Sequence, residues 1–234
     1  MKKVFVVIGM LLAMCGLSFA ESSFDTEVSG LRKSIISMCA QLQAGQPKES
    51  QEQLLKEIDG IINGWEKITA TYKDNPPSQY AKDPAWKSYF AEALDNFQIM
   101  RQKAEGKDYQ RAMQFCGMNC ALFTTIYEVN GVNKITNKMF HLRKQLKMVV
   151  DTASTGNWTG AAVMLNNAIK LRDEVVKFPW PVGADKKEHS EMMKNLSKVV
   201  DSFAQAVNTK DIKEVKSKFG ALLKVFGVIY IKYI

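Results

Sequence analysis

Two cysteines stand four residues apart in the segment QFCGMNCALFTTIY, Gln114–Tyr127. Residues at positions i and i+4 of an α-helix lie on the same face, so Cys116 and Cys120 would point in one direction. Cys39 is the third cysteine outside the first twenty residues. Thiols in this arrangement can attach a prosthetic group, ligate a soft metal ion, form a disulfide or pack in a core.

The first twenty residues have the composition of a secretory signal peptide. They contain two lysines, an apolar run over 4–14 and small residues before Glu21. We expect cleavage after Ala20, which removes Cys15 and lowers the formal net charge from +8 to +6. No other apolar run is long enough for a membrane helix, so we expect no membrane insertion of the mature chain and a location in a bacterial periplasm.

Apolar residues recur every three or four positions in eight segments, which is the spacing of amphipathic helices. The sequence predicts helices over residues 25–44, 48–72, 85–104, 108–129, 132–155, 158–177, 185–208 and 211–233. No alternating β-branched run bounded by turn residues indicates a strand. The predicted fold class is therefore all-α.

The two halves of the chain repeat one another. At an offset of 111 the tripeptide LRK at 31–33 matches LRK at 142–144, and at an offset of 103 the matching pairs are Gly117/Gly220, Phe123/Phe226 and Tyr127/Tyr230. Four helices with short links in each half indicate two tandem antiparallel four-helix bundles, residues 21–130 and 131–234, with the boundary near Gly131.

This arrangement suggests how the cysteines pair. Cys39 lies near the end of the first predicted helix, level with the opening turns of an antiparallel fourth helix, where Cys116 is closer than Cys120. In an oxidising compartment we expect a Cys39–Cys116 disulfide and a free Cys120. Two alternatives remain open: the three sulfurs bind copper or zinc together with neighbouring methionines, or all three are small buried hydrophobic residues.

The last helix of each half resembles that of the cytochrome c-prime family, which carries a motif of the form G-x-x-C-x-x-C-H-x-x-Y. The residues at this spacing are Gly117, Cys120, Phe123, Thr124 and Tyr127 in the first half, and Gly220, Leu223, Phe226, Gly227 and Tyr230 in the second. The resemblance implies exported four-helix bundles in which the last helix binds haem covalently. It also implies that Cys120 is the relic of a haem site, because the second thiol and the histidine are missing from both copies.

Covalent haem needs thiols for its thioether bonds and an axial ligand to the iron, such as imidazole. Neither Thr124 nor Gly227 supplies an imidazole, and Leu223 and Phe226 should fill the space of a haem in the second half. We therefore expect two haem-less bundles without a cofactor. Any ligand pocket is expected in residues 21–130, where the smaller cysteines leave more room.

These features favour a periplasmic binding or interaction protein that is not an enzyme, whose partner is an unknown protein or a small ligand. Charged residues are dispersed along the chain, which argues against nucleic-acid binding, and no nucleophile and base stand at an interpretable spacing. His189 is expected to be solvated. The alternatives are a haem-binding electron-transfer or gas-binding cytochrome attached through Cys120, and a copper or zinc carrier that uses Cys39, Cys116 and Cys120.

Overall fold

The structure is a computed structural model that describes residues 22–43, 50–179 and 184–234. These residues form eight α-helices and no strand, which confirms the all-α prediction. The helices are α1 (Ser23–Gln43), α2 (Gln51–Tyr72), α3 (Trp86–Glu105), α4 (Tyr109–Val129), α5 (Ile135–Ser154), α6 (Trp158–Val176), α7 (Lys186–Thr209) and α8 (Ile212–Tyr233). The proposed signal peptide lies outside the described residues.

Side-chain caps define where several helices begin, and they explain why the predicted starts are accurate to within three residues. The side chains of Ser50, Asp108, Asn157 and Asp185 each accept a hydrogen bond from the backbone N–H three residues later. These side chains satisfy N–H groups that have no partner inside the first turn of a helix.

Among the helices of the described chain, none is both long and apolar enough to cross a membrane.

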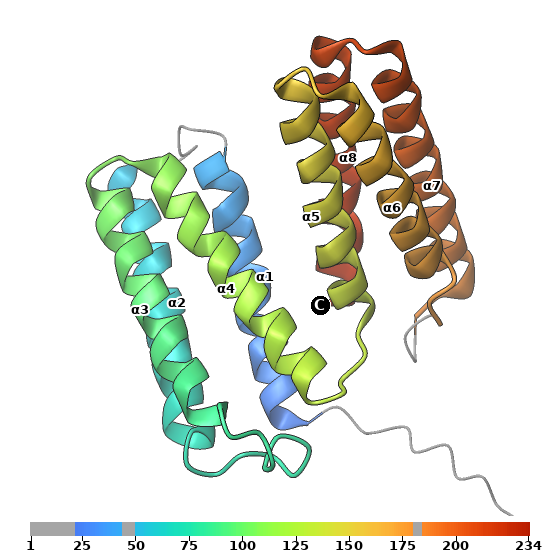
Figure 1. Ribbon diagram of the computed structural model, residues 1–234. Coiled ribbons are helices and arrows are strands. Elements are labelled where there is room, and N and C mark those ends of the chain that lie inside the picture. The colour runs from blue at the N-terminus through green and yellow to red at the C-terminus, as the bar shows by residue number, and fades with distance from the viewer. Residues whose placement is uncertain (1–21, 44–49, 180–183) are drawn as a thin grey trace, which may run out of the picture.

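The eight helices pack in two groups of four (Figure 1). We call α1–α4 the first unit and α5–α8 the second unit. In each unit, helices that follow one another in sequence pack together, and the first helix also packs against the fourth. Each unit has its own core of buried hydrophobic side chains, so the apolar face of each helix is covered mainly by helices of the same unit.

The link between the units is short and begins at a left-handed turn. Gly131 has a φ of +69°, which lets the chain leave α4 without the steric penalty that a side chain would meet there. The N–H of Val132 bonds to the carbonyl oxygen of Tyr127 at 2.8 Å and closes the turn. The chain passes from α4 to α5 through this turn.

The two units touch along α1 and α4 on one side and α5 and α8 on the other. These are the first and last helices of each repeat. Residues at equivalent positions of the two repeats consequently meet at one interface, which positions the site described next.

Candidate functional site

Helix α4 places the residues of the cysteine segment on its buried side. Cys116, Cys120, Thr124 and Tyr127 follow one another at helical spacings, and each is at most 8% exposed. The Thr124 hydroxyl donates a hydrogen bond to the carbonyl oxygen of Cys120 at 2.9 Å. The position at which the family motif has a histidine is therefore held by a small side chain that bonds to its own helix.

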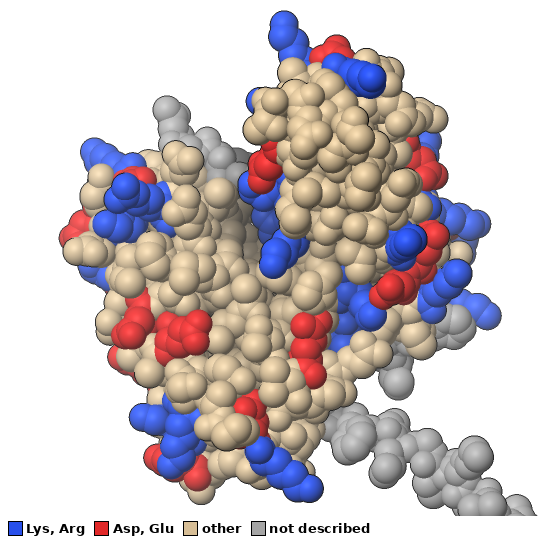
Figure 2. All heavy atoms as spheres, in the orientation of Figure 1, with Lys and Arg blue, Asp and Glu red and all other residues tan. Residues whose placement is uncertain are grey.

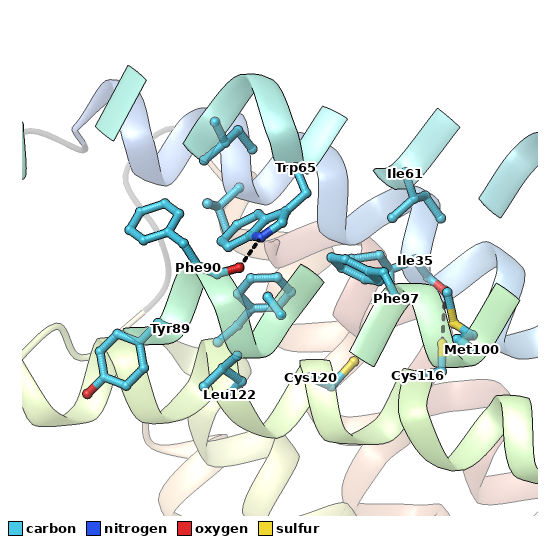
Figure 3. Close-up of a cluster of buried hydrophobic side chains, with 14 of the residues drawn as sticks. Ile35, Ile61, Trp65, Tyr89, Phe90, Phe97, Met100, Cys116, Cys120 and Leu122 are labelled. Atoms are coloured by element: carbon cyan, nitrogen blue, oxygen red, sulfur yellow. Dashed lines mark hydrogen bonds between the residues drawn. The ribbon is translucent and has the colours of Figure 1, made fainter. Parts of the chain in front are cut away.

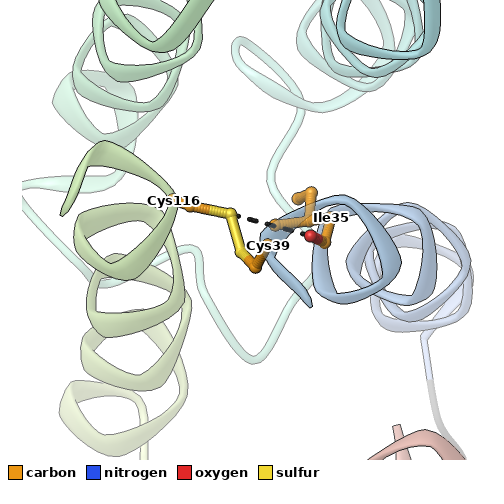
Figure 4. The surroundings of a disulfide bond; sticks show 3 residues. All are labelled: Ile35, Cys39 and Cys116. Atoms are coloured by element: carbon orange, nitrogen blue, oxygen red, sulfur yellow. Dashed lines mark hydrogen bonds between the residues drawn. A yellow bond between two sulfur atoms is a disulfide. The ribbon is translucent and has the colours of Figure 1, made fainter. Parts of the chain in front are cut away.

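Cys39 of α1 and Cys116 of α4 form a disulfide, as predicted (Figure 4). Their Cα atoms are 6.0 Å apart, inside the range that a disulfide spans without backbone movement. The Cys116 sulfur also lies 3.6 Å from the carbonyl oxygen of Ile35. This is a packing contact, because a disulfide sulfur carries no hydrogen to donate.

Cys120 keeps a free and buried thiol. Burial raises the pKa of this thiol, and the positive charges of Arg32 and Arg143 act in the opposite direction without reversing the rise. A thiol that stays protonated is a poor nucleophile and a poor metal ligand. No group of three or more His, Cys, Asp or Glu side chains in the described ranges is placed to hold a metal ion.

Aromatic side chains fill the interior of the first unit beside Cys120 (Figure 3). The Trp65 ring stacks on Phe90 with centroids 5.2 Å apart and meets the edge of Phe123 at 5.6 Å. The Trp65 indole also donates a hydrogen bond to the carbonyl oxygen of Phe90 at 3.0 Å. Trp65 is therefore fully buried in the core of the first unit.

Both histidines have polar partners of their own. The Nε2 atom of His141 lies 2.7 Å from a carboxylate oxygen of Glu128. His189 is only 6% exposed, with its Nδ1 atom 2.7 Å from the hydroxyl of Tyr233, so its predicted solvation is wrong. Burial lowers the pKa of His189, which favours the neutral ring. The residues around Cys120 therefore do not fit a haem: the interior is packed and no imidazole faces it.

A buried arginine lies between the two units. Arg32 of α1 is 1% exposed, and its guanidinium carbon is 5.6 to 5.8 Å from the ring centres of Phe123, Tyr127 and Tyr230. Its Nη2 atom donates a hydrogen bond to the Tyr230 hydroxyl at 2.9 Å. Within the described ranges, the Nε and Nη1 atoms have no hydrogen-bond partner and no carboxylate pairs with this charge.

The tyrosines on either side of Arg32 are equivalent residues of the two repeats, Tyr127 of α4 and Tyr230 of α8. Burial raises the pKa of both phenols, although the charge of Arg32 opposes this, so both stay neutral around the cation. Arg32 was not predicted as a site residue from the sequence. A usable signal was its helical spacing from Val28 and Ile35, which places it on the apolar face of α1.

A small pocket opens next to this cluster, at the interface of the units. It has a volume of about 120 Å³ and is lined by Ile36, Cys39, Ala40, Cys120, Phe140, Arg143, Leu223, Phe226, Gly227 and Tyr230. Lys and Arg side chains gather along the upper part of the seam between the units (Figure 2). Four of its lining residues lie in residues 21–130, where a pocket was expected, and the other six lie in the second unit.

A larger hollow of about 1040 Å³ runs along α7 and the end of α6. Its described lining includes four lysines and three serines, and none of the three cysteines. The smaller pocket between the units is lined by Cys39, Cys120 and Arg143, so we treat it as the candidate site.

Comparison with known proteins gives no matching family model, no matching curated sequence and no matching solved structure.

Proposed function

We propose that the protein is a periplasmic, non-enzymatic binding protein composed of two tandem four-helix bundles that resemble cytochromes c-prime and hold no haem. The repeat in the sequence and the identical order of helix contacts in the two units support the duplication. The absence of enzyme chemistry is supported by the raised pKa of the Cys120 thiol and by the partners of both histidines.

One observation carries the haem-less assignment. Cys120 belongs to the core of the first unit, in which the Trp65 ring stacks on Phe90 and meets Phe123 edge to face. Protein interiors are packed as densely as organic crystals, so a haem would have to displace these rings. The pocket of about 120 Å³ is also well below the roughly 300–1,000 Å³ typical of cofactor-sized sites.

Export is supported by the composition of residues 1–20 and by the Cys39–Cys116 pair at disulfide distance. Disulfides persist in oxidising compartments and are rare where thiols are kept reduced. With Cys39 and Cys116 joined, Cys120 is the single free thiol of the described chain, which weakens the copper or zinc carrier as an alternative.

Titration with haem tests the proposal against the cytochrome alternative. We expect the purified protein to give no saturable Soret shift, and Cys120→Ala to give the same result, because packed rings occupy the interior. A one-to-one saturable Soret shift that Cys120→Ala weakens would contradict the haem-less assignment. Haem adsorbed on the surface would instead give an unsaturated change of equal size in both proteins.

A further inference from the structure

The pocket between the units is built for a ligand of only a few heavy atoms. Its volume of about 120 Å³ is comparable with the liquid volume of roughly four water molecules. Helices α1 and α4 contribute one side, and α5 and α8 contribute the other. Both units are therefore needed to form it.

The lining has two chemically different parts. Most of it is apolar, with Ile36 on α1, Phe140 on α5 and Leu223 on α8 among the larger side chains. Arg143 is the only charged lining residue within the described chain, and it forms no salt bridge there. An arginine beside an apolar wall suits a ligand with an anionic head and a short apolar body, since guanidinium and carboxylate form paired hydrogen bonds.

Tyr230 adds a hydrogen-bond donor to the lining of the pocket. Its hydroxyl oxygen accepts the hydrogen bond from Arg32, so its own proton remains available to donate. The hydroxyl is held neutral, because burial raises the pKa of Tyr230. No other hydrogen bond of this hydroxyl occurs among the described residues.

Arg32 makes the region more attractive to an anion. Among the described residues, two nitrogens of this buried guanidinium have no hydrogen-bond partner and no carboxylate faces it. Burial of the charge is therefore costly, because no ion pair offsets its desolvation. Arg32 contacts Tyr230 on the pocket wall and carries its charge close to Cys120, another wall residue. An anion in the pocket would lie near two cations that occupy equivalent positions of the two repeats, Arg32 and Arg143.

We propose that this pocket binds a short-chain monocarboxylate, with its carboxylate at Arg143 and the Tyr230 hydroxyl and its alkyl chain against Ile36, Phe140 and Leu223. The inference rests on the proposed function as a binding protein and names its ligand class. An inorganic oxyanion would leave the apolar walls without contacts, and a neutral alcohol would leave the cations unpaired.

Isothermal titration of the full mature chain with butyrate tests this proposal. We expect saturable one-to-one binding, and no binding of butyramide or inorganic phosphate at the same concentrations. Arg143→Met should weaken butyrate binding roughly ten- to a hundredfold, because it removes a charge-assisted contact. The matched control Lys144→Met removes a charge from the next exposed residue and should leave the affinity unchanged.

A substitution that fills the pocket with a larger side chain tests its location without changing any charged residue. A Cβ atom at Gly227 or at Gly220 meets no atom within 4 Å, so valine at either position is expected to leave the fold intact. Gly227 lines the pocket and Gly220 does not. Gly227→Val should therefore reduce butyrate binding, while Gly220→Val on the same helix should not.

Absence of butyrate binding to the wild-type chain, equal affinity for phosphate, or unchanged affinity in Arg143→Met would each overturn the inference. The proposed function is tested separately: saturable haem binding would contradict it, whatever the result with butyrate. If the protein binds neither butyrate nor haem, the proposed ligand class is wrong and the haem-less assignment stands.

Discussion

Substitution of Trp65 with alanine is expected to destabilise the protein by about 3–5 kcal/mol, the range for removing a buried aromatic side chain. Trp65 is fully buried, stacks on Phe90 and meets the edges of Phe97 and Phe123. Its removal would leave a large cavity and would also lose the indole hydrogen bond to the Phe90 carbonyl. Urea unfolding followed by circular dichroism measures the loss.

Two further variants make this prediction specific. Trp65→Phe keeps most of the ring packing and loses the hydrogen bond, so it should cost about 1–2 kcal/mol. Trp158 begins α6 and is only partly buried, so Trp158→Ala should cost clearly less than Trp65→Ala. Equal losses for Trp65→Ala and Trp158→Ala would show that Trp65 is not at the centre of a packed core.

Removal of the disulfide by the double substitution Cys39→Ala and Cys116→Ala is expected to cost about 2–5 kcal/mol. The bond joins residues separated by 77 positions, so it restricts a long stretch of the unfolded chain. It also ties α1 to α4, which carry Arg32 and Cys120 at the interface between the units. Urea unfolding of the oxidised wild type and the double variant measures the difference.

The free cysteine provides the control for this experiment. Cys120→Ala keeps the disulfide and should remain sensitive to reductant, like the wild type. The double variant should be insensitive to reductant, because no disulfide remains to be broken. If reduction leaves the wild-type unfolding midpoint unchanged, the Cys39–Cys116 bond does not contribute to stability.

The helices and the disulfide were predictable from the sequence because both depend on local patterns. Helical periodicity and capping residues such as Asp108 and Asn157 mark the helix boundaries. Antiparallel packing of the first and fourth helices brings Cys39 level with Cys116. Each of these inferences needs only the order of elements within one unit.

The site was not predictable in the same way, because it depends on how the two units face one another. The duplicated tripeptide LRK was visible as a repeat, but only the packing of α1 and α4 against α5 and α8 shows that Arg32 and Arg143 converge. Leu223 was assigned to fill a haem site, and it lines the pocket between the units instead. His189 was misjudged because its burial depends on Tyr233 from the distant end of α8.

The visible absorption spectrum of the protein, exported from a host that matures c-type cytochromes, tests the central claim most directly. Covalent attachment requires that maturation machinery, so this host gives Cys120 every opportunity to acquire haem. We expect a folded, helical and colourless protein. A Soret band that survives extraction with acid acetone would show haem bound covalently to the chain and would contradict the haem-less assignment.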